Sequence, residues 1–230
     1  MTALQKRKKN RAHQASSVLP WIPPDSPISL SKAIRDRISR EYDATGVFLN
    51  IPFDDRYSEL EMALTSTLTA YGLTPHIAKE RRRVEVRLLK IVELMLTCKY
   101  GITDLSMPNR MNMPFELGLL LGFGRETFLM SSKRYSALQS ISDMNFCDVY
   151  YHENKCESLI SGLSQWIERT CSKKQISTRT LIGRFGALKA AKKSLGEDYH
   201  KLRLDQIKSL LGIAQEGLRY PAALHPKKQG

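Results

Sequence analysis

The chain has 230 residues, of which 42% are hydrophobic and 26% charged, proportions typical of a folded, soluble protein. No apolar run is long enough to cross a bilayer, and no apolar segment follows the N-terminal basic cluster, so we expect neither a membrane span nor a secretory signal. The four cysteines form no CxxC pair, which argues against a disulfide framework or a metal site and predicts a cytoplasmic protein with reduced thiols. They are Cys98, Cys147, Cys156 and Cys171.

The net charge of +13 is concentrated at the two ends of the chain. Residues 1–13 carry five Lys/Arg and no acid, and residues 171–230 carry thirteen Lys/Arg against four acids. The remaining residues, 14–170, hold 18 bases and 19 acids. The basic termini suit a weak, sequence-independent contact with nucleic-acid phosphates. A solvated tail is the simpler interpretation of the N-terminal cluster, because no aromatic residues for base stacking are interleaved with its charges.

In chain order, residues 1–28 predict a basic, proline-rich, disordered arm, and residues 29–42 a helix. Ser58 is expected to cap the next helix and Gly72 to end it. Short apolar segments predict strands over 47–51, 74–78, 100–104, 127–130 and 147–151. Amphipathic or apolar segments predict further helices over 86–98, 114–122, 135–142 and 158–171.

This alternation predicts an α/β fold, a flavodoxin/Rossmann-like parallel sheet of about five strands with flanking helices. We assign residues 29–172 to this domain and residues 173–230 to a basic, helical C-terminal extension. Ligands of open parallel sheets bind outside the carboxyl ends of the strands. The segments 50–57 and 104–116 should therefore lie in one crevice.

Asp104 and Glu116 are the candidate catalytic residues in that crevice. Asp104 ends an apolar strand, and Glu116 is the single charge of the predicted helix 114–122. Pro114 fits the first helical position, which puts Glu116 in the first turn, where the helix dipole favours its ionised form. Gly118 and Gly122 are expected to let this helix approach the sheet closely.

Paired carboxylates suit cleavage of an N-glycosidic bond, because positive charge develops on the sugar as the base departs. Glu116 would act as nucleophile or electrostatic stabiliser, and Asp104 would bind sugar hydroxyls or assist the base. A first-turn glutamate can also serve only to stabilise a helix. An aspartate after a strand can equally be an ordinary turn or cap residue.

Further residues around the crevice are candidates for substrate binding, although a hydrophilic turn or a solvated helix face explains several of them as well. Arg87 would contact a phosphate or carboxylate. The sequence has no glycine-rich phosphate cradle, its histidines lack metal-ligand spacing, and it nominates no Ser-His-Asp arrangement, so no metal and no cofactor is predicted. The substrate-binding candidates are Asn50, Phe53, Asp54, Tyr57, Arg87, Ser106, Asn112 and Met113.

Three segments, together with Arg87 and Ile91 on a predicted helix, carry a resemblance to a known family: Val47-Phe-Leu-Asn-Ile-Pro-Phe-Asp54, Ile102-Thr-Asp-Leu-Ser106 and Asn112-Met-Pro-Phe-Glu-Leu-Gly-Leu119. Over residues 45–170 the chain resembles bacterial proteins similar to nucleoside 2-deoxyribosyltransferases and, more remotely, to Toll/interleukin-receptor (TIR) domains. The resemblance implies that Glu116 is the catalytic carboxylate and Asp104 its acidic partner. It places Asn50 and Tyr57 on the side that binds base and sugar.

Two departures leave the substrate open. A bulky segment, 107–113, replaces the family's small-residue loop, and Asn50-Ile-Pro-Phe53 replaces its Ala-Gly-Pro turn. The resemblance implies an N-glycosidase or deoxyribosyltransferase-like hydrolase or transferase acting on a nucleoside, nucleotide or NAD, with antiviral defence among the roles of such bacterial proteins. It also implies a homo-oligomer. The alternative is a non-catalytic nucleotide-binding sensor or interaction module of the same fold.

Overall fold

The computed structural model describes residues 30–52, 55–78, 87–107, 112–132 and 148–195. Several predicted features lie outside these ranges, namely the arm 1–28, the candidates Phe53 and Asp54, the helix 135–142 and the extension beyond residue 195. The side chain of Arg87 is likewise outside the described part.

The strands form one five-stranded parallel sheet in the order β2-β1-β3-β4-β5, which confirms the predicted flavodoxin/Rossmann-like α/β fold. The first strand begins four residues earlier than predicted, because Asp43 already pairs with Cys98 of the neighbouring strand. The strands are β1 (Asp43–Asn50), β2 (Thr74–Ile77), β3 (Cys98–Asp104), β4 (Glu126–Ser131) and β5 (Val149–Tyr151).

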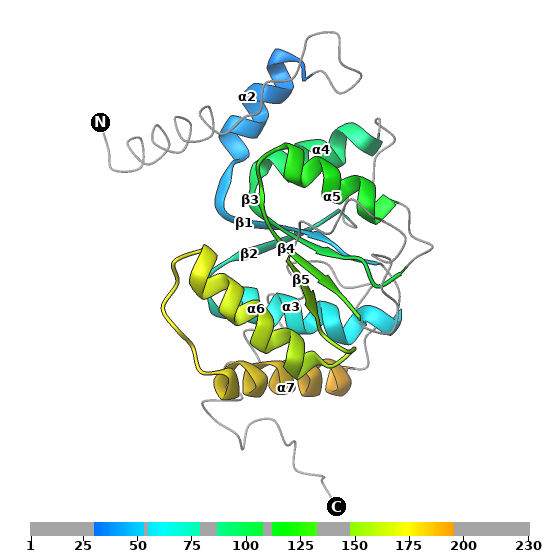
Figure 1. Ribbon diagram of the computed structural model, residues 1–230. Helices are drawn as coiled ribbons and strands as arrows, with labels where there is room; N and C mark the ends of the chain where they lie inside the picture. The colour runs from blue at the N-terminus through cyan, green and yellow to red at the C-terminus, as the bar shows by residue number, and fades with distance from the viewer. Residues whose placement is uncertain (1–29, 53–54, 79–86, 108–111, 133–147, 196–230) are drawn as a thin grey trace, which may run out of the picture.

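Helices cover both faces of the sheet (Figure 1). The helices α4 and α5 lie on one face and α3 and α6 on the other, while α7 lies across the outer side of α3 and α6. A short helix, α2, precedes the first strand at the opposite end of the molecule from α7. The elements are α2 (Lys32–Glu41), η1 (Asp55–Tyr57), α3 (Ser58–Ala70), α4 (Arg87–Thr97), α5 (Asn112–Gly122), α6 (Cys156–Thr170) and α7 (Thr178–Leu195).

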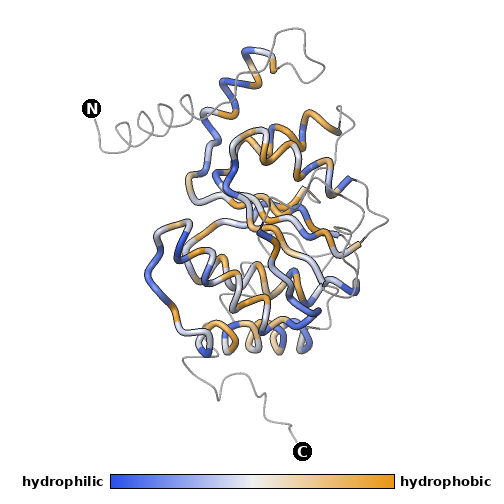
Figure 2. The backbone as a smooth tube through the Cα atoms, viewed as in Figure 1, coloured by the Kyte–Doolittle hydropathy of each residue, from blue (hydrophilic) through white to orange (hydrophobic). Residues whose placement is uncertain are grey.

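The strands are apolar because a parallel sheet is buried on both faces. In β1, Val47 and Leu49 pack with α3 and α6, whereas Phe48 points to the other face and packs with Val92 and Met95 of α4. Figure 2 shows the resulting hydrophobic stretches along the central strands and the helices beside them. The core therefore consists of two apolar layers separated by the sheet.

The first helix of the predicted C-terminal extension packs on the α/β domain and shares its core. Leu181, Phe185, Leu188 and Ala191 of α7 are buried in the same hydrophobic cluster as α3 and α6. Their spacing of three to four residues forms one apolar stripe, as expected for an amphipathic helix on a protein surface. Ile182 and Ala187 pack against the margin of this cluster, and the opposite side of the helix is exposed.

The predicted boundaries of α3 are right at one end and wrong at the other. Gly72 ends the helix with φ +69°, a left-handed conformation that glycine adopts without strain. Ser58 does not cap it, because Ser58 is already the first helical residue and Tyr57 occupies the cap position without a side-chain hydrogen bond.

Across the described helices, none has both the length and the apolar character that crossing a membrane requires.

Candidate functional site

Buried polar side chains gather at the carboxyl ends of four neighbouring strands. Asn50 ends β1, Asp104 ends β3, Ser132 follows β4 and His152 follows β5. The parallel register places them along one edge of the sheet. Each is at most 1% exposed. Burying polar groups costs free energy unless they are hydrogen-bonded, so their hydrogen bonds decide what this edge can do.

Asn50 links β1 to the neighbouring strand and to the start of α5. Its Nδ2 donates to Thr103 Oγ1 at 3.3 Å and to the carbonyl oxygen of Met113 at 3.0 Å. Its Oδ1 is buried and has no hydrogen-bond partner within the described structure. The strand order reverses between β1 and β3, and such switch points are where open parallel sheets bind ligands.

Asp104, at the same switch point, is fully buried, and only one of its two carboxylate oxygens is hydrogen-bonded within the described structure. Its Oδ1 accepts hydrogen bonds from the Ser106 N–H at 2.7 Å and from the Ser106 hydroxyl. Its Oδ2 has no hydrogen-bond partner among the described residues. Burial raises the pKa of Asp104 to about 6, although both hydrogen bonds from Ser106 act to lower it. Near neutral pH the carboxyl is therefore mostly ionised, with one oxygen open to a donor.

His152, directly after β5, is the third member of the network around Asp104 and Ser106. Its Nδ1 accepts the Asn154 N–H at 3.1 Å, so in the neutral ring the proton is on Nε2. That Nε2 lies 3.3 Å from Ser106 Oγ and 3.9 Å from Asp104 Oδ2. Burial lowers the pKa of His152 to about 4. Although His152 and Asp104 lie within ion-pair distance, the histidine is neutral at pH 7 and donates only a weak bond to Ser106.

The trio of Asp104, Ser106 and His152 is not a hydrolase triad. In such a triad the aspartate accepts from Nδ1–H of the histidine, and Nε2 accepts the serine proton. Here Nδ1 is taken by the Asn154 N–H, and both the serine and the aspartate face Nε2. The Ser106 hydroxyl donates to Asp104 and accepts the Ser132 N–H at 2.8 Å. This geometry fixes Asp104 in place and leaves no histidine nitrogen to accept the Ser106 proton.

Glu116 lies on α5, but three expectations about that helix are wrong. The helix begins at Asn112, so Pro114 is its third residue and Glu116 falls outside the first turn. A proline fits there because the first four N–H groups of a helix have no intrahelical acceptor. A Cβ placed on Gly118 or Gly122 would meet nothing within 4 Å, so these glycines face outward and do not bring the helix closer to the sheet.

The sheet side of α5 is formed by Met113, Leu117 and Leu120, which are buried. Glu116 is half-buried and follows Met113 by three residues, about 4.5 Å further along the helix axis. The contact between Asn50 and the Met113 carbonyl thus holds the start of α5 against the switch point, one turn before Glu116.

The predicted binding residues divide into two groups. Ser106 is hydrogen-bonded to Asp104, and Asn50 is hydrogen-bonded to the carbonyl of Met113; all four are buried at the carboxyl edge of the sheet. Tyr57 belongs to the hydrophobic core, and Asn112 is an exposed residue at the start of α5. Arg87 begins α4.

Sequence reasoning missed Thr103, Ser132 and His152. The signal that could have found them is the polar residue at the end of each apolar strand, because parallel strands end at one edge.

Comparison with known proteins gave no match: no family model, curated protein or solved structure is similar to this chain at a significant level. What the site can do follows from its own atoms. Two buried acceptors at the ends of neighbouring strands, Asn50 Oδ1 and Asp104 Oδ2, are each suited to groups that donate hydrogen bonds, such as hydroxyl or amino groups. Within the described ranges, no three Cys, His, Asp or Glu side chains are grouped to hold a metal ion.

Proposed function

We propose that the protein is an N-glycosidase or deoxyribosyltransferase-like enzyme that cleaves the bond between sugar and base in a nucleoside, nucleotide or NAD. The observation that best supports this proposal is that two buried acceptors at the switch point, Asn50 Oδ1 and Asp104 Oδ2, have no donor among the described residues. Leaving a buried acceptor unpaired costs about 1–3 kcal/mol, and a substrate hydroxyl would remove that cost.

In the proposed reaction the sugar hydroxyls donate to Asp104 and Asn50, which fixes the sugar relative to α5. The bond between the anomeric carbon and the base nitrogen breaks, and its electron pair leaves with the base. The Glu116 carboxylate then stabilises or adds to the positively charged anomeric carbon. Water or a second base attacks that carbon. The proton released by the attacking group balances the one taken up by a nucleoside base, whereas the nicotinamide of NAD leaves as a neutral molecule and the proton goes to solvent.

The second candidate is a nucleotide-binding module without turnover. It is favoured by the enclosure of Asp104, which is fully buried and held by two hydrogen bonds from Ser106. A carboxyl group in that position is better suited to recognising a donor than to exchanging protons with solvent. In this case the same crevice would bind the nucleotide, and the protein would report its presence to a partner.

Base release from candidate substrates separates the two functions. The full chain is incubated with nucleosides, deoxynucleotides and NAD, and free base is measured by chromatography for wild type, Glu116→Gln and Glu157→Gln. Glu157 is an exposed acid of α6 on the other face of the sheet and serves as the matched control. We expect Glu116→Gln to lose at least about 10²-fold in rate and Glu157→Gln to keep wild-type rate.

Substrate binding without release of base, equal in wild type and Glu116→Gln, would contradict the enzyme and support the binding module.

A cytoplasmic location, a role in antiviral defence and a homo-oligomeric state belong to the same proposal, because all three rest on the expectations from sequence. The oligomeric state is measured by light scattering of the full chain.

A further inference from the structure

The outward face of α7 is smooth and basic at both ends. The residues of this face are three or four positions apart, on the side of the helix opposite the buried stripe of Leu181, Phe185, Leu188 and Ala191. A Cβ placed on Gly186, near the middle of this face, would meet nothing within 4 Å. The exposed face comprises Arg179, Gly183, Gly186, Ala190 and Lys193.

The helix and the segment before it are a run of positive charge without acids. Residues 169–195 contain eight Lys/Arg and no Asp or Glu. Of the thirteen basic residues between 171 and 230, seven lie within 171–195, whereas all four acids of that region lie beyond it. The net positive charge of the C-terminal region is thus concentrated in residues 171–195, where five of the seven Lys/Arg lie on α7. The eight residues are Arg169, Lys173, Lys174, Arg179, Arg184, Lys189, Lys192 and Lys193.

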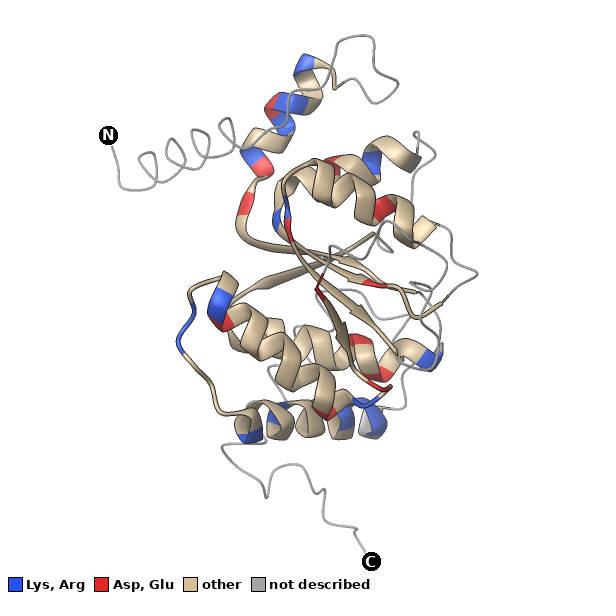
Figure 3. Cartoon of the chain, viewed as in Figure 1, with Lys and Arg blue, Asp and Glu red and all other residues tan. Residues whose placement is uncertain are grey.

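Among the described residues, most of the exposed charge in this run has no acidic partner. Lys189 pairs with Glu59 of α3 at 2.6 Å. In the part of the chain that the structure describes, Arg179 and Lys193 form no ion pair, and both are exposed. Figure 3 shows the basic residues along α7, with the acidic residues nearest to it on α3 and α6. An uncompensated charge of this kind attracts polyanions.

We propose that the outward face of α7 binds the phosphate backbone of a nucleic-acid duplex without reading its sequence. Arg179 and Lys193 are fourteen residues apart, a separation of about 21 Å along the helix axis. Two cations at that distance can contact separate phosphates of one duplex, whose charges recur every few ångströms. The small residues between them let the duplex backbone approach the helix closely.

The composition of this face favours a duplex over two other anionic partners. A membrane-binding helix inserts large apolar residues, and α7 exposes none; the exposed large hydrophobic residues of the described structure are Phe115, Leu121 and Tyr151, on α5 and β5. Single-stranded nucleic acid is bound largely by stacking on aromatic side chains, and the outward face of α7 contains none.

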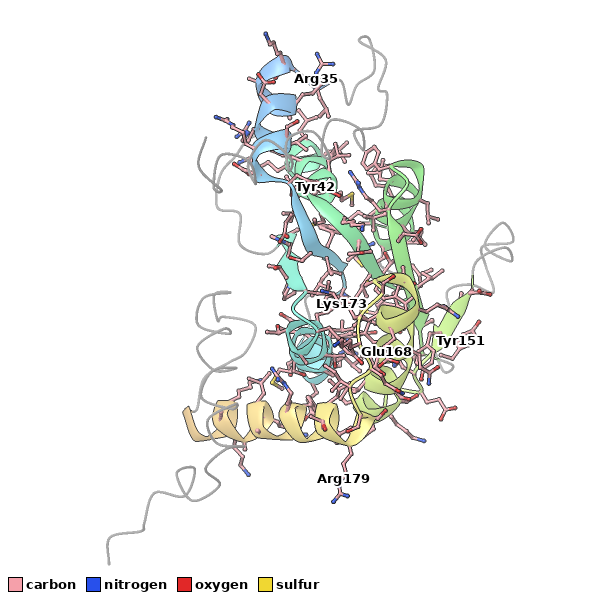
Figure 4. The ribbon with its side chains drawn as sticks, turned by 90° about the vertical axis from the view of Figure 1, so that its left-hand side faces the viewer. Arg35, Tyr42, Tyr151, Glu168, Lys173 and Arg179 are labelled. Carbon is pink, nitrogen blue, oxygen red and sulfur yellow. The ribbon has the colours of Figure 1, made fainter. Side chains whose placement is uncertain are left out.

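This surface is separate from the crevice at the strand ends. The helix α7 lies outside α3 and α6, whereas Glu116 belongs to α5 on the other face of the sheet (Figure 1). Duplex binding therefore does not depend on the proposed glycosidase function. Figure 4 places Arg35 of α2 and Arg179 of α7 at opposite ends of the molecule, which supplies a control with the same change of charge.

The test measures binding of the full chain to a labelled, mixed-sequence duplex by fluorescence anisotropy over a series of salt concentrations. The double variant Arg179→Gln/Lys193→Gln is compared with Arg35→Gln/Arg40→Gln, two exposed arginines of α2. We expect the α7 variant to bind about tenfold or more weakly near 0.1 M salt and to reduce the slope of log affinity against log salt by about two. The α2 variant should keep the wild-type slope.

DNA and RNA duplexes of one sequence, the corresponding single strand and phosphatidylserine vesicles serve as competing partners, and circular dichroism checks folding. Binding of either duplex supports the proposal, and the comparison tells which is preferred. The proposal is overturned if the α7 variant keeps the affinity and salt slope of the wild type. Preference for the single strand, or for vesicles over both duplexes, would overturn it as well.

Discussion

Two aspartates at opposite ends of neighbouring strands have opposite electrostatic environments. Asp43 begins β1, and its Oδ1 accepts from the Thr45 N–H at 2.9 Å and from Thr45 Oγ1 at 2.7 Å. His76 Nε2 lies 3.3 Å from its Oδ2. Burial acts to raise the pKa of Asp43, but the hydrogen bonds from His76 and Thr45 together outweigh it, and the pKa is lowered. Asp104 ends β3 with one oxygen unpartnered and its pKa raised to about 6.

The difference shows that ionised Asp43 stabilises the fold and that ionised Asp104 lowers the free energy of unfolding. Every hydrogen bond of Asp43 favours its charge, so Asp43 stabilises the native state in its ionised form. The charge of Asp104 is buried without enough donors, so its ionised form destabilises the native state. A buried acid with one hydrogen-bonded oxygen, at the carboxyl edge of a parallel sheet, is what the proposed binding site requires.

The largest effect on stability is expected for Asp104→Asn. The folded pKa of Asp104, about 6, is above the ordinary value of an aspartate. Protonated Asp104 therefore stabilises the fold below about pH 4, and this contribution is lost as pH rises through about 6. Asparagine stays neutral, so the variant should be more stable than wild type by about 3 kcal/mol at pH 8. The difference should disappear near pH 4. Urea unfolding between pH 4 and pH 8 measures it.

His152→Gln is the control for this experiment because its effect has the opposite pH dependence. The lowered pKa of His152, about 4, means that the neutral ring contributes stability above about pH 6.5, and that this is lost as pH falls through about 4. From pH 6.5 to pH 4 the stability of Asp104→Asn relative to wild type should therefore fall, and that of His152→Gln relative to wild type should rise. Parallel slopes in the two variants would contradict the account of the network.

A smaller effect of opposite sign is expected for Asp43→Asn. The substitution replaces a charged acceptor of the Thr45 and His76 hydrogen bonds with a neutral amide, which should cost about 1–2 kcal/mol at pH 7. Because the folded pKa is lowered, the contribution of Asp43 is present above its ordinary pKa and is lost as pH falls further. Thermal unfolding at pH 7 and at pH 3 should show the deficit shrinking in acid; a deficit independent of pH would refute the charge argument.

The sheet could be predicted from sequence because its signal is local. Each strand is a short apolar run and each helix a periodic one, and their alternation allows few topologies. The errors arose where a local rule had a competing explanation. Pro114 suggested a helix start two residues too late, and Gly118 and Gly122 suggested close packing where the helix faces outward.

The candidate site was predicted only in part, because its network is formed by the tertiary structure. Ser106 and His152 are 46 residues apart, and no sequence motif connects them. Asp104 is predicted from its position at the end of a strand, and the same rule applied to the predicted strand 147–151, which the structure confirms at Val149–Tyr151, selects His152. The half-satisfied state of Asp104 depends on burial by neighbouring segments, which no local pattern encodes.

The central claim is that the carboxyl edge of the sheet, at Asp104, binds a nucleoside. Its most direct test is the affinity of the full chain for nucleosides and nucleotides, measured by isothermal titration calorimetry for wild type, Asp104→Asn and Asp43→Asn. Loss of a charged acceptor that receives a substrate hydroxyl should weaken binding by about 10- to 100-fold in Asp104→Asn, although that protein is the more stable one. Asp43→Asn should bind as wild type does. Unchanged affinity in Asp104→Asn would contradict the claim.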